Sequence, residues 1–215
     1  MLIIAIDGPS ASGKGTVAKI IAEHFKISHL DTGLLYRAVA FNTMKTYKTV
    51  SVEKALKVVA NLSEEDLQNS KLRLQKYSDL ASELAKEELV RNSLIGFQRN
   101  FPRQTNGAVL DGRDIGSVIF PKAQVKLFVT ADISVRALRR QEELIKIGQN
   151  ISLKEVKERL IIRDERDRNR EFSPLVCPRD ATVIDTSLIP FGDLEKEIIE
   201  IVEKKYKSLS LGSSE

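Results

Sequence analysis

The chain has 215 residues, which at about 100 to 200 residues per domain is enough for one or two domains. Hydrophobic residues make up 42% of it, so the chain can bury a sizeable core and is not expected to be disordered. The net charge of +4 is mild and fits an anionic small substrate as well as nucleic acid. A single cysteine, Cys177, excludes an intramolecular disulfide and favours a reducing compartment. No apolar run approaches the roughly 20 residues of a membrane span, and we expect a cytoplasmic protein without a membrane partner.

The first distinctive stretch runs from Gly8 to Thr16, with the sequence GPSASGKGT. It follows an apolar run at residues 2–6 and precedes a helical pattern, and this strand–loop–helix order is typical of a phosphate-binding loop. Glycines allow main-chain N–H groups to face an anion, the following helix adds the positive end of its dipole, and Lys14 adds a charge. We therefore predict that ATP binds through Gly8, Pro9, Ser10, Ala11, Ser12, Gly13, Lys14, Gly15 and Thr16.

The end of this loop is unusual, because Gly15 separates Lys14 from the hydroxyl of Thr16. Most such loops place Ser or Thr directly after the lysine, where the hydroxyl reaches the metal. The GKGT ending is similar to that of nucleoside monophosphate kinases. Whether Thr16 contacts Mg²⁺ directly stays open.

A second strand is expected at residues 27–30, followed by Asp31, Thr32 and, six residues after Asp31, Arg37. A cation just past a strand end is well placed to face the same crevice as the phosphate loop, although a solvated surface arginine is the alternative. Residues 43–95 contain no glycine and carry apolar residues at helical intervals. We predict a helical insertion at about residues 38–103, with Ser51 or Ser63 as a helix cap. One long helix is expected over 78–97, with Leu80, Leu84, Leu89 and Leu94 facing inward.

Charged residues follow the third predicted strand, residues 108–110, in the run Asp111-Gly112-Arg113-Asp114. Two carboxylates and an arginine at the end of a buried strand are costly unless they serve one another or a ligand, and both explanations stay open. A fourth strand is expected at 125–129. A helix should follow at 132–147, and its arginines are expected to be exposed: Arg136, Arg139 and Arg140.

An arginine-rich helix should begin at Ser152, within a segment of about residues 148–172. Its spacing places four arginines on one stripe: Arg159, Arg163, Arg166 and Arg170. Such a run is usually an ordinary solvated helix, but with a phosphate loop upstream we predict a lid that closes over polyphosphate. A fifth strand at 181–185 and a last helix at 193–206 complete the chain.

Four motifs together resemble the bacterial cytidylate kinase family, which converts CMP or dCMP into CDP or dCDP. They are GPSASGKGT, LDTGLLYR ending at Arg37, LDGRDIGSVIFP from Leu110, and RDERDRNR ending at Arg170. The resemblance spans nearly the whole chain. It implies an α/β fold, namely a three-layer αβα P-loop core with a five-stranded parallel sheet, a helical monophosphate-binding insertion and an arginine-rich lid.

The resemblance also implies the substrate contacts. CMP would bind through Thr32, Arg37, Ser82, Arg91, Arg113, Asp114, Arg163, Asp167 and Arg170. Three of these would recognise cytosine, namely Ser82, Arg91 and Asp114. The catalytic charges would come from Lys14, Arg113, Arg163 and Arg170. ATP is the expected co-substrate and Mg²⁺ the cofactor, with Asp31 and Asp111 at strand ends as candidates to hold water in the metal shell.

A nucleotide phosphate is already mostly ionised at neutral pH, so phosphoryl transfer to it needs no general base. We therefore expect His24 and His29 to be incidental. Alternatives are a P-loop kinase for another monophosphate or small metabolite, an ATP-dependent nucleic-acid-binding factor, or a non-catalytic nucleotide-bound module. With 6% aromatic residues and no Trp there are few stacking platforms, and we expect no nucleic-acid partner. We expect a monomer, because no long apolar surface stripe remains unassigned.

Overall fold

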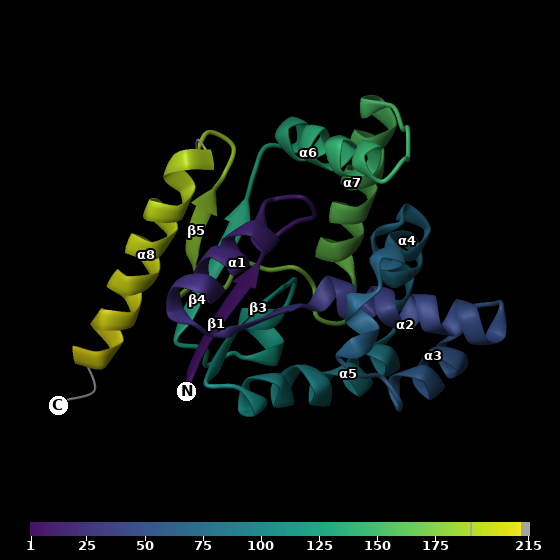
Figure 1. Cartoon of the computed structure of the whole chain (residues 1–215), viewed down its shortest axis with the longest axis horizontal. Coiled ribbons are helices and arrows are strands. Elements are labelled where there is room, and N and C mark those ends of the chain that lie inside the picture. Colours follow the sequence, from purple (N-terminus) through teal and green to yellow (C-terminus); the bar gives the residue numbers. More distant parts are fainter. Residues whose placement is uncertain (190, 212–215) are drawn as a thin grey trace.

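A single parallel sheet organises the chain, whose computed structural model describes residues 1–189 and 191–211. The strands lie in the order β2-β3-β1-β4-β5 (Figure 1). Their bounds are β1 Leu2–Asp7, β2 Ser28–Asp31, β3 Gly107–Gly112, β4 Val125–Thr130 and β5 Thr182–Asp185. Each of the five predicted strands is confirmed. The carboxyl ends of β1, β2 and β3 carry Asp7, Asp31 and Asp111, so polar residues from distant parts of the chain meet at one edge.

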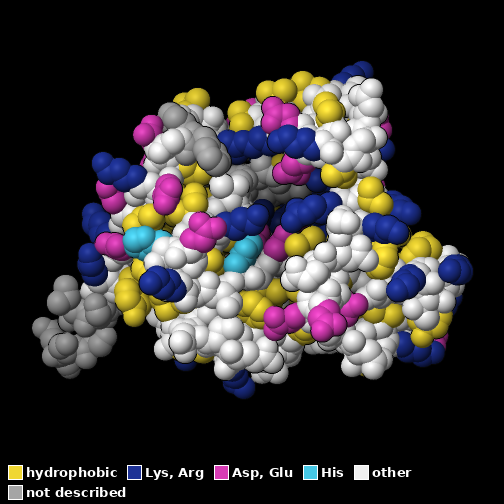
Figure 2. Space-filling model, viewed as in Figure 1, with side chains coloured by type: hydrophobic (Ala, Val, Ile, Leu, Met, Phe, Trp, Pro, Cys, Tyr) yellow, Lys and Arg dark blue, Asp and Glu magenta, His cyan; other side chains and the backbone are white. Residues whose placement is uncertain are grey.

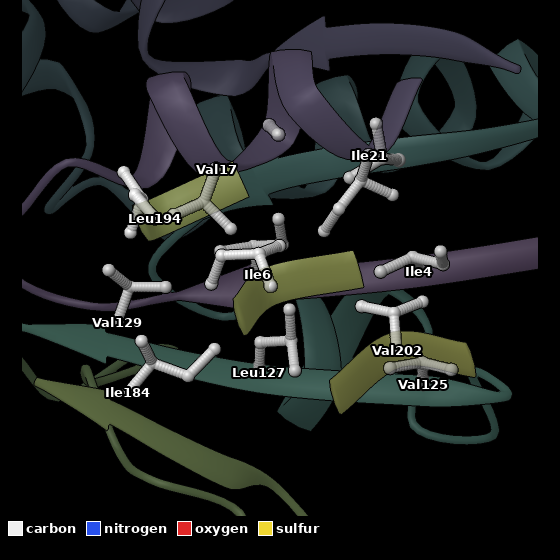
Figure 3. Close-up of a cluster of buried hydrophobic side chains, with 13 residues drawn as sticks. Ile4, Ile6, Val17, Ile21, Val125, Leu127, Val129, Ile184, Leu194 and Val202 are labelled. Atoms are coloured by element: carbon white, nitrogen blue, oxygen red, sulfur yellow. The ribbon is translucent and has the colours of Figure 1, made fainter. Parts of the chain in front are cut away.

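Helices cover both faces of the sheet. On one face α1 (Lys14–Phe25) and α8 (Phe191–Leu211) pack against each other. Ile4 and Ile6 of β1 point into this layer and contact a buried apolar cluster that includes Val17 and Leu127 (Figure 3). The alternate residue Ala5 faces the other side, where it joins Leu110. This alternation along β1 is what a strand buried on both faces requires.

The segment predicted as a helical insertion consists mainly of helices, but the single long helix expected within it is divided into two. The elements are α2 (Thr32–Tyr47), α3 (Val52–Val59), α4 (Gln75–Leu84) and α5 (Glu88–Asn100), with short 3₁₀ turns at Glu65–Gln68, Ser70–Arg73 and Phe101–Gln104. The expected helix over 78–97 breaks between α4 and α5, with no glycine or proline to signal the break. The break changes the helical register, so Val90 and Leu94 are buried whereas Leu89 is 62% exposed. The prediction that Leu89 faces inward was wrong.

Of the two serines expected to cap a helix, Ser51 is the cap. Its Oγ accepts a hydrogen bond from the N–H of Lys54 at 3.4 Å, at the start of α3. Ser63 instead donates to the carboxylate of Asp66, which accepts from both its N–H and its Oγ. The helices α2 to α5 share their own apolar cluster, separate from the one between the sheet, α1 and α8.

Two further helices, α6 (Ile133–Lys146) and α7 (Leu153–Asn169), lie in the upper part of Figure 1. They pack against each other through Ala137, Leu144, Val156 and Leu160. Ser152 caps α7 as predicted, accepting from the N–H of Glu155 at 3.2 Å. Arg136 of α6 is only 5% exposed, so the expectation that it lies on the solvent side was wrong. Within residues 1–189 and 191–211, we find no helix with the length and apolar character needed to cross a bilayer.

Candidate active site

The phosphate loop, residues 8–16, leaves β1 in a backbone conformation that depends on glycine. Gly8 has a φ of +150°, and a Cβ there would lie 2.0 Å from the carbonyl oxygen of Val129. Gly13 has a φ of +89° and caps α1, which begins at Lys14. The loop therefore turns sharply and ends at the amino terminus of α1, where N–H groups and the helix dipole attract an anion.

Three carbonyl groups of this loop are held by donors from three parts of the chain. Lys14 Nζ donates to Pro9 O at 2.6 Å, from within the loop itself. Thr186 Oγ1, just after β5, donates to Ser12 O at 2.9 Å. Arg136 Nη1 of α6 donates to Ser10 O at 3.2 Å. Because a trans peptide points its N–H opposite to its carbonyl, fastening the carbonyls also orients the N–H groups.

The loop forms one wall of a cavity of about 1130 Å³. The other walls come from the ends of β2 and β3 and from α2, α6 and α7. They bring together sequence-predicted residues that lie far apart in the chain: Asp31, Arg37, Asp111, Arg113 and Arg163. Figure 2 shows Lys and Arg side chains around the mouth of a hollow on this face of the molecule. Lys14 and, of the arginines predicted on α7, Arg163 line this same cavity.

The buried cations of the cavity lack enough opposite charge around them. Burial and the nearby Arg113 guanidinium lower the pKa of Lys14 to about 7. Burial, again with Arg113, lowers the pKa of Arg163 to about 9, and burial lowers that of Arg37 to about 10. Arg37 Nε and Arg163 Nε are buried without a hydrogen-bond partner among the described residues. Desolvated cations that repel one another are the arrangement expected of a site that receives an anion.

Two carboxylates lie beside these cations. Asp31 caps α2 by accepting from the N–H of Leu34 at 3.1 Å, and burial together with the neighbouring Asp111 raises its pKa. Asp111 Oδ1 lies 2.7 Å from His29 Nε2. Both aspartates line the cavity, and a divalent cation would relieve their mutual repulsion. Across the described ranges, 1–189 and 191–211, no three His, Cys, Asp or Glu side chains come together as a metal cluster.

A second group of sequence-predicted residues gathers at the carboxyl end of β3, and of its members only Arg113 also lines the large cavity. Arg91 Nη2 donates to Asp114 Oδ2 at 2.5 Å, and Arg170 Nη2 lies 4.0 Å from Asp114 Oδ1. Arg113 Nε donates to Asp167 Oδ2 at 2.7 Å. Burial alone would raise the pKa of Asp167, but Arg113 and Arg163 hold it below its usual range. These five side chains thus form one charged network behind the phosphate site.

Two predicted CMP contacts have other partners. Thr32 Oγ1 donates to the carbonyl of Asp111 at 2.8 Å and is buried. Ser82 Oγ accepts from Arg166 Nη1 at 3.0 Å and lines a separate cavity of about 250 Å³ between α4 and α7. Arg163 lines both cavities, so Ser82 lies near the charged network but outside the large cavity.

The predicted arginine stripe of α7 faces α4. Arg163 Nη1 donates to Ser78 Oγ at 2.7 Å, and Arg166 Nη2 pairs with Glu83 at 2.9 Å. Arg159 is the most exposed of the four, with 45% of its side chain accessible, and its guanidinium lies 3.8 Å from Asp79. The helix therefore carries Arg163 and Arg166 against the insertion, whereas Arg159 stays largely exposed.

Besides Thr186, the residues of the site that sequence reasoning missed include Asp7, His29 and Arg136. Asp7, at the end of β1, accepts from the N–H groups of Ile115 and Gly116 at 2.8 and 2.7 Å, which fixes the turn after Asp114. Burial raises the pKa of Asp7 to about 6. His29 is not incidental, because it lines the cavity and contacts Asp111. Arg136 was expected in solvent. The position of Asp7 directly before the loop motif was a signal that could have identified it. No local sequence pattern indicates His29 or Arg136 as residues of the site.

Comparison with known proteins agrees with this geometry. The cytidylate kinase family matches residues 4–204. Cytidylate kinase from Acidiphilium cryptum is 46% identical over 204 residues, which cover 94% of this chain and 96% of that protein. Cytidylate kinase from Azorhizobium caulinodans is 45% identical over 203 residues, covering 94% and 98%.

Among solved structures, an uncharacterised protein from Eubacterium ventriosum ATCC 27560 superposes with a TM-score of 0.56 at 17% identity, covering 94% of this chain and 99% of that one. TT1252 from Thermus thermophilus gives a TM-score of 0.50 at 20% identity, covering 94% and 97%. These two structures share the fold. The match of the family over residues 4–204, together with relatives of about 45% identity along almost the full length, shows that this chain belongs to the cytidylate kinase family.

Proposed function

We propose that this protein transfers the γ-phosphoryl group of ATP to CMP, and to dCMP, giving CDP or dCDP and ADP. The observation that carries the proposal is that the phosphate loop shares one cavity with arginines from other elements, among them Arg37, Arg113 and Arg163. A reaction that joins two anions needs counter-charges of this kind on both sides of the transferred group. The names of the relatives support the choice of CMP.

We assign ATP to the phosphate loop and CMP to the opposite side of the cavity. Arg37, Arg113 and Arg163 would hold the phosphates, while Thr32, Asp167 and Arg170 lie on the ribose side. For the base we propose Asp114, Arg91 and Ser82, with Asp114 as the acceptor for the exocyclic amine of cytosine. A uracil base would present a carbonyl oxygen to the same carboxylate, which gives a physical reason for selectivity.

The chemistry asks little of the protein beyond position and charge. A phosphate oxygen of CMP forms a bond to the γ-phosphorus as the bond from that phosphorus to ADP breaks, and no side chain has to remove a proton. Lys14 and the arginines offset the charge of the transferred group, and closure of the lid would exclude the water that could otherwise accept the phosphoryl group. We place Mg²⁺ beside Asp31 and Asp111, whose mutual repulsion suits a cation held through water. When bound, it supplies further neutralisation of the ATP phosphates.

We further propose that the insertion, about residues 38–103, and the lid, about residues 148–172, move against the core. The separate apolar cluster of α2 to α5 supports movement of the insertion as a unit. Residue 38 falls inside α2, so the movable part would include the end of a helix that begins in the core. The single cysteine, Cys177, suits a cytoplasmic enzyme, and we propose a monomer.

The test is a coupled assay of ADP formation with ATP, Mg²⁺ and four acceptors: CMP, dCMP, UMP and AMP. We expect CMP and dCMP to give the highest kcat/KM. Turnover with AMP alone, or with none of the four, would contradict the proposal.

A further inference from the structure

One buried guanidinium, that of Arg136 on α6, joins three segments of the chain. Its Nε donates to the carbonyl of Ala131 at 2.9 Å, just after β4. Its Nη1 donates to the carbonyl of Ser10 in the phosphate loop at 3.2 Å and to Asp164 Oδ2 on α7 at 2.6 Å. The core, the phosphate loop and the lid helix therefore meet at a single side chain.

The pair of Arg136 and Asp164 is almost completely buried, with 6% and 4% of the two side chains accessible. Removing two charges from water is expensive, and a buried ion pair is weak support for stability in itself. Asp164 Oδ1 is buried without a hydrogen-bond partner among the described residues, so the carboxylate is not fully satisfied. The presence of this pair is better explained by the geometry that it imposes than by a contribution to the free energy of unfolding.

The geometry that it imposes lies in the phosphate loop. The carbonyl of Ser10 belongs to the same peptide as the N–H of Ala11, and a trans peptide points these two groups in opposite directions. Ala11 has a φ of +58°, a left-handed conformation that a residue other than glycine adopts only when its surroundings hold it there. The bond from Arg136 is one such restraint. Asp164, next to Arg163 in the sequence, in turn fixes Arg136 from the lid helix.

We infer that Arg136 and Asp164 are positioning residues that couple the lid helix to the shape of the phosphate loop. The inference rests on the proposed kinase function and extends it to two residues that touch neither nucleotide. A lid helix that shifts takes Asp164 with it, and this loosens Arg136 from Ser10 and disturbs the N–H groups that receive ATP. Conversely, a loop shaped by ATP holds Arg136 in place and favours the lid helix in its present position.

The experiment separates positioning from packing by replacing the pair with apolar residues of similar size. The variants are Arg136→Met, Asp164→Leu and the double variant, each assayed for Tm, KM for ATP and kcat with CMP. Each single variant leaves one buried charge unpaired and should lower the Tm. The double variant should recover most of the Tm, yet keep a kcat/KM for ATP at least 10-fold below that of the unmodified chain.

A matched control is Lys126→Met. Lys126 is also a buried cation, with 7% of its side chain accessible, and it pairs with Asp180. Lys126 lies in the amino-terminal half of β4, at the end of the strand away from the phosphate loop. The Lys126→Met variant should have a lower Tm but an unchanged KM for ATP. If the apolar double variant does not fold, Arg136→Lys serves instead, because it keeps the charge but loses the fork that reaches three acceptors. It should retain most of the Tm and lose activity.

Two outcomes would overturn the inference. One is a double variant, or Arg136→Lys, with kinetic constants equal to those of the unmodified chain. The other is a loss of activity that follows the Tm in every variant, including Lys126→Met. Failure of the kinase proposal is recognised separately, since then the unmodified chain itself would phosphorylate none of the four acceptors.

Discussion

Arg91 and Asp114, 23 residues apart, form a 2.5 Å hydrogen-bonded ion pair in which both side chains are less than 8% accessible. The guanidinium of Arg91 also lies over the ring of Tyr36, 5.5 Å from its centroid. The carboxylate proposed to select cytosine is thus held from one side by an arginine of the insertion. One of its oxygens faces Arg91, and the other lies 4.0 Å from Arg170.

We predict that Asp114→Asn lowers the preference for CMP over UMP. An asparagine still accepts from the amine of cytosine through its oxygen, but it also offers an N–H₂ group to the O4 of uracil. Discrimination by one such polar contact is worth about 1–3 kcal/mol, so the ratio of the two kcat/KM values should fall by roughly 5-fold to 160-fold. Asparagine is preferred to alanine here, because alanine would leave Arg91 buried and unpaired. An unchanged ratio would remove Asp114 from base recognition.

Lys14→Met should abolish most of the turnover while the fold persists. The methionine keeps the aliphatic length but removes the charge that we propose faces the ATP phosphates. Loss of one electrostatic contact at a reacting centre typically costs a factor of about 100 to 1000 in kcat. Circular dichroism and Tm check the fold, and single-turnover assays measure the chemical step. Turnover within a few-fold of the unmodified chain would exclude Lys14 from the mechanism.

The affinity for ATP should fall as the pH rises above about 7. Burial and Arg113 lower the pKa of Lys14 to about 7, so part of the protein carries a neutral lysine at that pH. Bound polyphosphate favours the ammonium form and raises this pKa, and binding must therefore take up a proton. Calorimetry in buffers of different ionisation enthalpy should show an uptake that rises from about half a proton at pH 7 towards one proton at pH 8.5. Lys14→Met is the control, and it should show less uptake.

Asp31→Asn and Asp111→Asn should each raise the Mg²⁺ concentration needed for half-maximal activity. Removing one of two adjacent carboxylates weakens the attraction for a divalent cation. Asp111→Asn also removes the charge that, together with burial, raises the pKa of Asp31. Asparagine remains a good helix cap, so Asp31→Asn should leave α2 intact. Titration with Mg²⁺ at fixed ATP measures the effect, and identical curves for both variants and the unmodified chain would contradict the proposed metal position.

Local sequence patterns predicted the strands of the sheet well. They predicted the charged network around Asp114 and Asp167 only in part. Apolar runs located β1, β3 and β4, because an inner strand that is buried on both faces is almost uniformly apolar. The edge strands β2 and β5 were also located, but they are shorter and partly exposed, so this reason does not apply to them. The arginine stripe of α7 followed from spacing alone. The break between α4 and α5 has no local signal, since it is set by the need to bury Val90 and Leu94 against α2 and α3.

The residues that were missed depend on partners from distant segments. Arg136 looks like any exposed helical arginine until α7 brings Asp164 to it. His29 becomes part of the site only because β2 pairs with β3, which aligns Asp31 with Asp111 at the strand ends. Order along the chain does not reveal that pairing, since about 75 residues of helical insertion separate the two strands.

The fastening of the phosphate loop has a consequence for protein engineering. Ser10 and Ser12 are held through their carbonyls by Arg136 and Thr186, which lie more than 120 positions later in the chain. Transplanting the nine-residue segment onto a foreign strand would leave both tethers behind. A recipient scaffold would have to provide its own donors at those two places before the transplanted segment could hold a nucleotide.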